Sequence, residues 1–188
     1  MTKYTFERRV CELTADLPRL QAAIAPMLRA RHVLFEEFNR LHRCVLQAVR
    51  HDEVCLRFTT MPGVGPITAL AFKTAVETPE RFSKSKTVGA HFGLTPRKYS
   101  SGQIDYQGHI SKCGDALVRT TLYEAASVLL TRVRASSALK TWGLRIAKRA
   151  GAKRARVALA RKIAVILHRM WRDGTDFRCA VPVSAATV

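Results

Sequence analysis

Apolar residues recur at spacings of three, four or seven along the N-terminal part of the chain. The series is Leu20, Ile24, Met27, Leu34, Phe38, Leu41 and Val45, with Arg31 at the one missing position. This spacing predicts a helix from about residue 17 to residue 50 with an a/d-like apolar stripe. Pro26 is expected to kink this helix or to begin it. A stripe this apolar should pack on the body of the protein or on another copy of the chain, whereas residues 1–16 favour no single element.

The stretch RFTTMPGVGPITALAFKTAV, residues 57–76, predicts two helices joined by a tight turn. Gly63, Val64 and Gly65 form the turn, and Pro66 suits the first position of the second helix. Backbone N–H groups at a glycine-rich helix start can bind phosphate, as in a helix-hairpin-helix module. The alternative is an ordinary interhelical turn without a ligand.

A short helix is expected from Lys84 to His91, followed by a small β-hairpin between Arg97 and Ile110. Ser101-Gly102 should lie at or beside the hairpin turn. Asp115 is a plausible N-cap for a helix that continues to about Thr131. The expected inner face of that helix consists of Leu117, Leu122, Ala125, Ala126 and Leu129.

The last third of the chain is strongly basic. Residues 132–172 contain thirteen Lys and Arg and no Asp or Glu. An apolar helical stripe within this stretch comprises Val157, Ala160, Ile163, Ala164, Leu167, Met170 and Trp171, and the cations occupy other faces. A charged helix face is usually only solvated, but a run without acids repels itself, so we expect it to contact phosphates.

The composition supports a polyanionic partner. The 188 residues carry a net charge of +18, and 47% of them are hydrophobic, which is enough for a core. Nucleic acid is the first expectation and an acidic membrane surface the second. No apolar run is long enough for a transmembrane helix, and the N-terminus lacks the apolar region of a secretory signal. The five cysteines stand far apart and form no CxxC pair, so we expect neither disulfides nor zinc but a reducing, cytoplasmic location.

Phosphodiester chemistry in proteins can use bound metal ions or a nucleophilic side chain. Two-metal catalysis needs converging carboxylates, but the fourteen acids are scattered, so no metal site is predicted. A serine nucleophile would form a phosphoserine and conserve the bond energy for rejoining strands. Ser101 precedes a glycine that permits close approach of a ligand. Cations that could neutralise the phosphate are Arg97, Lys98, Lys112 and Arg119, yet the residues alone favour a structural role for Ser101, and equally for Ser100 and Ser111.

Three motifs in order, MPGVGPITA, RFSKSKTVGAHFGLTPRKYSSGQ and GHISKCGDALVRTTLYEAA, resemble a known family. The chain is similar to the C-terminal domain of DEDD-type insertion-sequence transposases, relatives of pilin-gene invertases in which a bridge RNA guides recombination. The resemblance covers residues 57–131 strongly and the flanking helices more loosely. It implies that Ser101 is the catalytic nucleophile, with Ser111 as second choice.

The resemblance also implies a multimeric recombinase whose complete form has an RNase H-like domain, with Asp-Glu-Asp-Asp ligands for Mg²⁺, and a coiled-coil arm. This sequence contains no DEDD set, so we expect a truncated gene copy, one half of a split frame or an excised domain. Such a chain should bind nucleic acid and self-associate but lack metal-dependent cleavage alone. Mg²⁺ is expected only in the absent domain.

The sequence therefore predicts a mainly α protein with a small β-hairpin. Residues 1–56 would form a helical, coiled-coil-like arm, residues 57–178 a serine domain with a helix-hairpin-helix and basic helices, and residues 179–188 a tail. The expected partners are DNA, a structured guide RNA and a second copy bound through the arm, without a membrane. The alternative is a non-catalytic DNA- or RNA-binding protein or an inactive transposase relic. Predicted nucleic-acid-binding residues are Gly63, Val64, Gly65, Arg97, Lys98, Lys112, Arg119, Lys153, Arg154, Arg156, Arg161 and Lys162.

Overall fold

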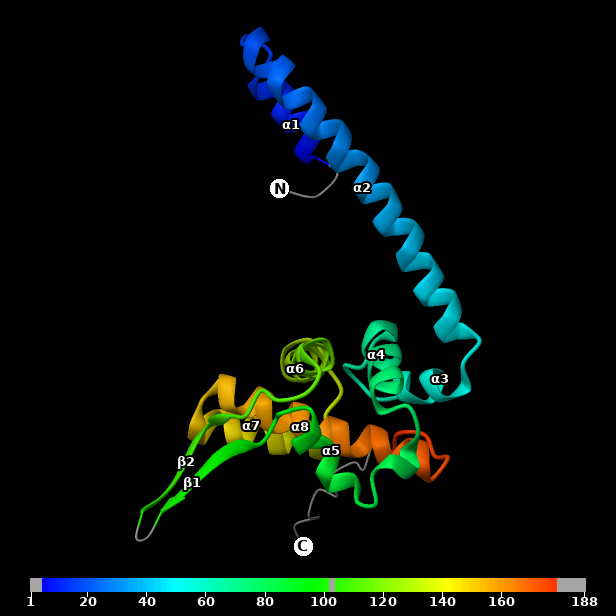
Figure 1. Cartoon of the computed structure of the whole chain (residues 1–188), viewed down its shortest axis with the longest axis vertical. Coiled ribbons are helices and arrows are strands. Elements are labelled where there is room, and N and C mark those ends of the chain that lie inside the picture. The colour runs from blue at the N-terminus through cyan, green and yellow to red at the C-terminus, as the bar shows by residue number, and fades with distance from the viewer. Residues whose placement is uncertain (1–4, 102–103, 179–188) are drawn as a thin grey trace, which may run out of the picture. The chain divides into compact units, whose positions relative to one another are not determined.

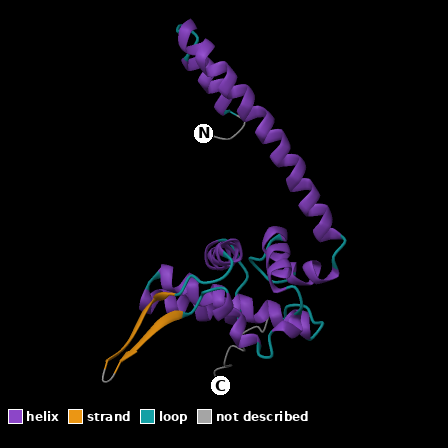
Figure 2. Ribbon diagram, in the orientation of Figure 1, coloured by secondary structure: helices purple, strands orange, loops and turns teal. Residues whose placement is uncertain are grey.

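The computed structural model describes residues 5–101 and 104–178, with the backbone alone between residues 98 and 107. It is mainly helical with one antiparallel pair of strands, as Figures 1 and 2 show, and this confirms the prediction of a mainly α protein with a small β-hairpin. Two compact units are present, residues 1–47 and residues 48–188. The predicted tail, residues 179–188, lies outside the described residues.

The first unit contains helix α1, Phe6–Leu13, and most of helix α2, Pro18–Arg50, which continues through Pro26. Arg31, the charged residue that interrupts the apolar stripe of α2, contacts α1. Its Nη1 lies 2.5 Å from Glu7 Oε1, and its guanidinium lies 4.8 Å from the centre of the Phe6 ring. The charged position in the stripe is therefore where the two helices are tied together.

Much of the α2 stripe is exposed in the single chain. Met27 and Leu34 are 69% and 71% exposed, and Leu20 and Leu41 are about half exposed. Exposure of several large apolar side chains along one helix is costly in water. The stripe is therefore left available for packing against another apolar surface.

The second unit is built around helix α8, Ala152–Arg172, which contacts α3, α5, α6, α7 and the short helix η1. Its inner positions Leu159, Ile163 and Leu167 are fully buried. The predicted stripe is confirmed, with Ala160, Ile163, Ala164, Leu167 and Met170 buried and Val157 and Trp171 partly buried, whereas Leu159 was not predicted. The surrounding helices are α3 Glu53–Thr59, α4 Pro66–Val76, η1 Pro79–Arg81, α5 Ser85–His91, α6 Ala116–Thr131 and α7 Ala138–Ala150.

Helix α6 begins as the sequence predicts but turns a slightly different face inward. Asp115 caps it, because its Oδ1 accepts the Val118 N–H at 2.9 Å. Leu117 was assigned to the inner face, and that prediction is wrong, since Leu117 is 60% exposed. Val118 and Thr121 are buried in its place, because adjacent helical positions differ by about 100° around the axis. The other four predicted positions, Leu122, Ala125, Ala126 and Leu129, are buried.

The predicted hairpin is confirmed. Strand β1, Pro96–Ser101, pairs antiparallel with strand β2, Ile104–Ile110, and Ser101 is opposite Ile104. The register shifts between Pro96 and Lys98. Ser101 is thus the last residue of β1, beside the turn, while the base of the hairpin returns to the helical body (Figure 1).

Candidate nucleic-acid interface

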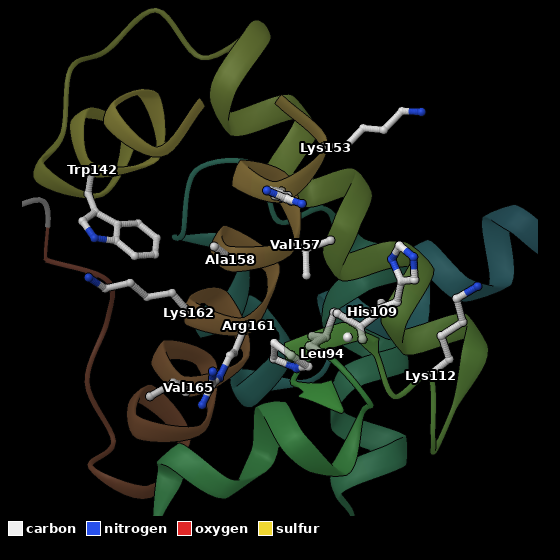
Figure 3. Close-up of a pocket in the computed structure, with 14 residues that line it drawn as sticks. Leu94, His109, Lys112, Trp142, Lys153, Val157, Ala158, Arg161, Lys162 and Val165 are labelled. Carbon is white, nitrogen blue, oxygen red and sulfur yellow. The ribbon is translucent and has the colours of Figure 1, made fainter. Parts of the chain in front are cut away.

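A cavity of about 1370 Å³ lies where the hairpin base meets helices α7 and α8. Its wall includes every fourth or third residue of one α8 face, which is the spacing that places residues on a common side of a helix. Figure 3 shows side chains from α8, from Trp142 of α7 and from His109 of β2 around it. The lining residues are Leu94, Pro96, Gly108, His109, Ile110, Lys112, Trp142, Lys153, Arg154, Val157, Ala158, Arg161, Lys162 and Val165.

The wall of the cavity is cationic. It contains five exposed Lys or Arg side chains and no Asp or Glu. Since like charges are gathered without compensating acids, the cavity favours a polyanion. The structure therefore brings together five of the sequence-predicted binding residues, namely Lys112, Lys153, Arg154, Arg161 and Lys162.

Two of these cations are positioned by specific neighbours. A Cβ at Gly89 of α5 would lie 2.6 Å from Arg161 Cγ, so the absence of a side chain there lets the Arg161 stem lie against α5. The Lys162 ammonium lies 4.3 Å from the centre of the Trp142 ring, which is a cation–π contact. These contacts fix the positions of the Arg161 stem and the Lys162 ammonium at the cavity.

Trp142 is a site residue that sequence reasoning missed. It is half-buried and packs against the core, yet one part of its ring faces the cavity (Figure 3). The signal was available, because Trp142 is an aromatic residue within a long stretch that has cations and no acids.

Two predicted phosphate ligands, Arg97 and Arg119, instead fasten the chain after β2. Arg97 Nη2 donates to the Ser111 carbonyl at 3.2 Å, and Arg119 Nη1 donates to the Cys113 carbonyl at 2.9 Å and to the Phe92 carbonyl at 3.3 Å. These bonds hold the segment that carries Lys112 at the cavity. Phosphate contact by either arginine stays a prediction.

Arg156 does not line the cavity, although it lies on α8. Its Nε is buried and has no hydrogen-bond partner among the described residues. The proposed phosphate contact of Arg156 stays a prediction, as does that of Lys98, whose side chain lies outside the described part of the chain.

Of the two candidate nucleophiles, Ser101 and Ser111, only Ser111 has its side chain among the described residues. The side chain of Ser101 lies outside the described residues, so its nucleophilic role stays a prediction. Ser111 is half-buried next to Lys112, and its N–H donates to the Thr95 carbonyl at 2.9 Å. Ser101 is at the opposite end of β1 from Pro96, which lines the cavity, and Ser111 directly follows the lining residue Ile110.

The glycine turn before α4 is partly used by the protein itself. A Cβ at Gly63 would lie 2.5 Å from the Ala125 carbonyl oxygen of α6, so glycine is needed for close packing there. The Val64 N–H donates to the Met61 carbonyl at 3.1 Å. Gly65, the N-cap of α4, has open space around its Cα, so phosphate contact at this turn now depends on the Gly65 end.

A buried histidine joins α8 to the segment ahead of α5. His168 Nε2 lies 2.8 Å from the Pro79 carbonyl oxygen and Nδ1 lies 2.9 Å from Ser85 Oγ. A carbonyl only accepts, so Nε2 carries the proton, Nδ1 accepts, and the Ser85 hydroxyl donates. His168 is fully buried and Ser85 is 5% exposed, so this pair is closed to substrates and acts as a tie.

A second polar tie lies at the start of α3. Asp52 Oδ1 accepts the Cys55 N–H at 2.9 Å, and Oδ2 pairs with Lys73 of α4. Burial alone would raise the pKa of Asp52, but the hydrogen bonds from Lys73 and Cys55 and the Lys73 charge outweigh burial and lower it. Burial raises the pKa of the Cys55 thiol to about 11, with the Asp52 charge adding to the effect, so this thiol is protonated at neutral pH.

Within residues 5–101 and 104–178, no group of three or more His, Cys, Asp or Glu side chains is arranged to hold a metal ion. Asp115 is occupied as the cap of α6. Among the same described residues, no helix combines the length and apolar character needed to cross a bilayer.

Comparison with known proteins gives one consistent family. Residues 55–142 match the model of the Transposase IS116/IS110/IS902 family. The chain is 37% identical over 168 residues to the transposase for insertion sequence element IS1111A of Coxiella burnetii, covering 89% of this chain and 45% of that protein. It is 32% identical over 168 residues to a probable family 20 transposase of Pseudomonas aeruginosa, covering 89% and 46%.

A third relative is the transposase for insertion sequence element IS1328 of Yersinia enterocolitica. It is 32% identical over 145 residues, covering 77% of this chain and 43% of the relative. The chain thus spans less than half the length of these curated relatives. The matched family region contains the hairpin and reaches Trp142, whereas the whole of the cationic α8 lies beyond it.

Proposed function

The chain is related to insertion-sequence transposases of the IS116/IS110/IS902 family, and we propose that it is the part of such an enzyme that binds nucleic acid and supplies a serine nucleophile. One observation carries the proposal: a cavity with five cations and no acid lies at the base of the hairpin that ends in Ser101. A transposase must hold a sugar-phosphate chain and attack it, and we assign the first task to this cavity and the second to Ser101 at the other end of β1.

In the proposed step, the Ser101 hydroxyl attacks a DNA phosphorus atom, forming an Oγ–P bond and breaking the bond to the leaving 3′- or 5′-oxygen, which takes up a proton. The phosphoserine link then accepts attack by a second strand end, which releases the serine. The cations at the hairpin base hold phosphates of the same DNA farther along its backbone, since Ser101 is at the other end of β1. Ser111, beside Lys112, is the second candidate for the same role.

The metal requirement of this chemistry would be met outside these 188 residues. We propose that an RNase H-like domain with DEDD carboxylates, acting on the same DNA, holds Mg²⁺ and that the serine domain acts with it. The residues described here do not by themselves form such a site. Alone, the chain is then a binder of nucleic acid and not an active recombinase.

Three further contacts complete the proposal. The α3–turn–α4 segment acts as a helix-hairpin-helix through the open Gly65 end. The exposed α2 stripe, with Met27 and Leu34, pairs with the same stripe of a second copy as a coiled coil. A structured guide RNA is the second polyanion that the net charge of +18 accommodates.

The catalytic proposal is tested by Ser101→Ala in a recombination assay that also supplies a DEDD domain. We expect loss of recombination and of the covalent protein–DNA adduct, with DNA affinity unchanged. Ser100→Ala is the neighbouring control, and Ser111→Ala tests the second choice. If Ser101→Ala and Ser111→Ala both recombine normally, the serine mechanism fails and the chain is a non-catalytic binding part.

The binding proposal is tested by the salt dependence of DNA affinity. Each phosphate contact contributes about 0.9 to the slope of log affinity against log salt on duplex DNA. Replacing Lys153 and Arg154 with Gln should lower the slope by about 1–2. The matched control replaces Lys148 and Arg149, exposed cations of α7 that do not line the cavity, and an equal effect of both pairs would refute a localised site.

A further inference from the structure

The wall of the cavity is not only cationic. Its inner surface is formed by Leu94, Pro96, Ile110, Val157, Ala158 and Val165, and the Trp142 ring borders it. A site that contacted only phosphates would need exposed cations and no apolar wall. The combination calls for a ligand with an apolar flat part as well as a negative charge.

We propose that this cavity binds an unpaired stretch of DNA, with a base stacked on Trp142 and its phosphates held by the surrounding cations. The proposal rests on the proposed function and specifies its substrate. In a duplex, base faces are covered by their neighbours, so a duplex would leave the ring and the apolar wall unused. A single strand exposes base faces and phosphates together.

The dimensions agree with such a ligand. The cavity measures about 1370 Å³, above the roughly 300–1,000 Å³ typical of pockets for drug-sized molecules. It therefore has room for more than a single base with its phosphate. Lys153, Arg154 and Lys112 are exposed around it, where the backbone of a strand would continue.

Lys162 and Trp142 form the part that would respond to binding. The Lys162 ammonium covers the Trp142 ring at 4.3 Å, in the position that a base would take. An arriving nucleotide replaces this cation–π contact with base stacking and offers its phosphate to the displaced ammonium. In the proposal, binding therefore requires Lys162 to move off the ring face that it now covers.

We assign DNA and not RNA to the cavity because the proposed strand transfer acts on DNA. The DNA ends that this transfer produces must be separated before they are rejoined. Unpairing places bases within reach of the hairpin base. The cavity lies beside β2, through His109 and Ile110, so a strand held here passes the hairpin that carries Ser101.

The test uses tryptophan fluorescence, because the chain has two tryptophans, Trp142 and Trp171. Trp171 packs edge-on against Phe58 at 5.9 Å, so Trp171→Phe keeps a ring there and leaves Trp142 as the reporter. The probes are an oligothymidylate strand of about 12 nucleotides, a duplex of mixed sequence and equal length, and the matching RNA strand. Binding is followed separately by the anisotropy of a dye on each probe.

We expect the DNA strand to quench Trp142 and the duplex to bind without quenching it. Trp142→Leu should weaken strand binding roughly 10-fold and duplex binding less than about twofold. Trp142→Tyr keeps a stacking ring and should bind the strand like the parent, which separates stacking from a folding defect.

The outcomes distinguish the two proposals. Equal quenching by strand and duplex, or strand binding without quenching, overturns the unpaired-DNA site and leaves the proposed function standing. Stronger quenching and tighter binding by RNA than by DNA overturns the assignment to DNA. Failure of every probe to bind at modest salt overturns both proposals.

Discussion

Replacing the buried His168 with phenylalanine should destabilise the second unit by several kcal/mol. The change keeps a ring of similar size and its edge contact with Phe82, whose centre lies 5.7 Å away. It removes two hydrogen bonds, so the Ser85 hydroxyl and the Pro79 carbonyl lose their partner in a buried place. Each buried unsatisfied group costs about 1–3 kcal/mol, which gives a total of about 2–6 kcal/mol.

The effects of substitutions at His168 and Ser85 on the free energy of unfolding should be coupled, because the two side chains share a hydrogen bond. Ser85→Ala alone leaves His168 Nδ1 without a donor and should cost about 1–3 kcal/mol. In the double variant the serine hydroxyl is no longer present to be left unpaired, so the two changes should cost less together than their sum, by about 1–3 kcal/mol. A purely additive result would show that the two groups do not interact.

The assay is urea unfolding followed by tryptophan fluorescence, since both tryptophans lie in the second unit. His51→Leu serves as the control, because His51 is exposed, and it should lie within about 0.5 kcal/mol of the parent. If His168→Phe also stays within about 0.5 kcal/mol, the described tie between α8 and the segment ahead of α5 is refuted.

Three further predictions concern other features. Gly89→Leu should displace the Arg161 stem and lower the salt slope of DNA binding by about 1, and an unchanged slope would remove Arg161 from the interface. The pKa of Asp52 is lower in the folded than in the unfolded protein, so its contribution to the free energy of unfolding is present above about pH 4 and is lost as pH falls through the folded value. Asp52→Asn should therefore flatten the acid side of the stability curve, measured by urea unfolding at each pH. The Cys55 thiol, with a pKa of about 11 and no exposure, should stay unlabelled by a thiol reagent at pH 8 in the folded protein, while Cys11, Cys44 and Cys113 react, as peptide mapping would show.

Local sequence signals predicted the elements well, because they depend on neighbours in the chain. The apolar period located α2 and α8, and Asp115 marked the start of α6. The hairpin expected between Arg97 and Ile110, with Ser101-Gly102 at or beside its turn, was also located. The family resemblance is supported at the level of insertion-sequence transposases.

Contacts between distant segments were not available from the sequence. Gly63 was interpreted as an anion-binding glycine, yet its missing side chain is also required by the backbone of α6. Arg97 and Arg119 were assigned to phosphates, but each donates to main-chain carbonyls that only the folded chain brings near. The sequence alone does not show whether an arginine will donate to a main-chain carbonyl of the folded protein or stay available for a phosphate.

The candidate site shows the same division. Charge counting along the chain identified Lys153, Arg154, Arg161 and Lys162, because the absence of acids there is a property of composition. The apolar wall and Trp142 were missed, since they come from four separate segments and form a surface only after folding. The charge of the chain indicated a polyanionic ligand. The apolar wall of the cavity, seen only in the folded protein, favours a polyanion that also exposes flat apolar groups, such as unpaired DNA.

Helix α8 touches five other helical elements with one side and presents four cavity cations on another. Residues on one side of α8 are therefore constrained by packing in the core, and residues on the other side by contact with the ligand. Inner positions tolerate little beyond small volume changes, and outer ones tolerate exchange between arginine and lysine more readily than loss of charge. In a random library confined to this helix, the defective variants should fall into two classes. One class does not fold, and the other folds but no longer binds its ligand, with few variants between the two.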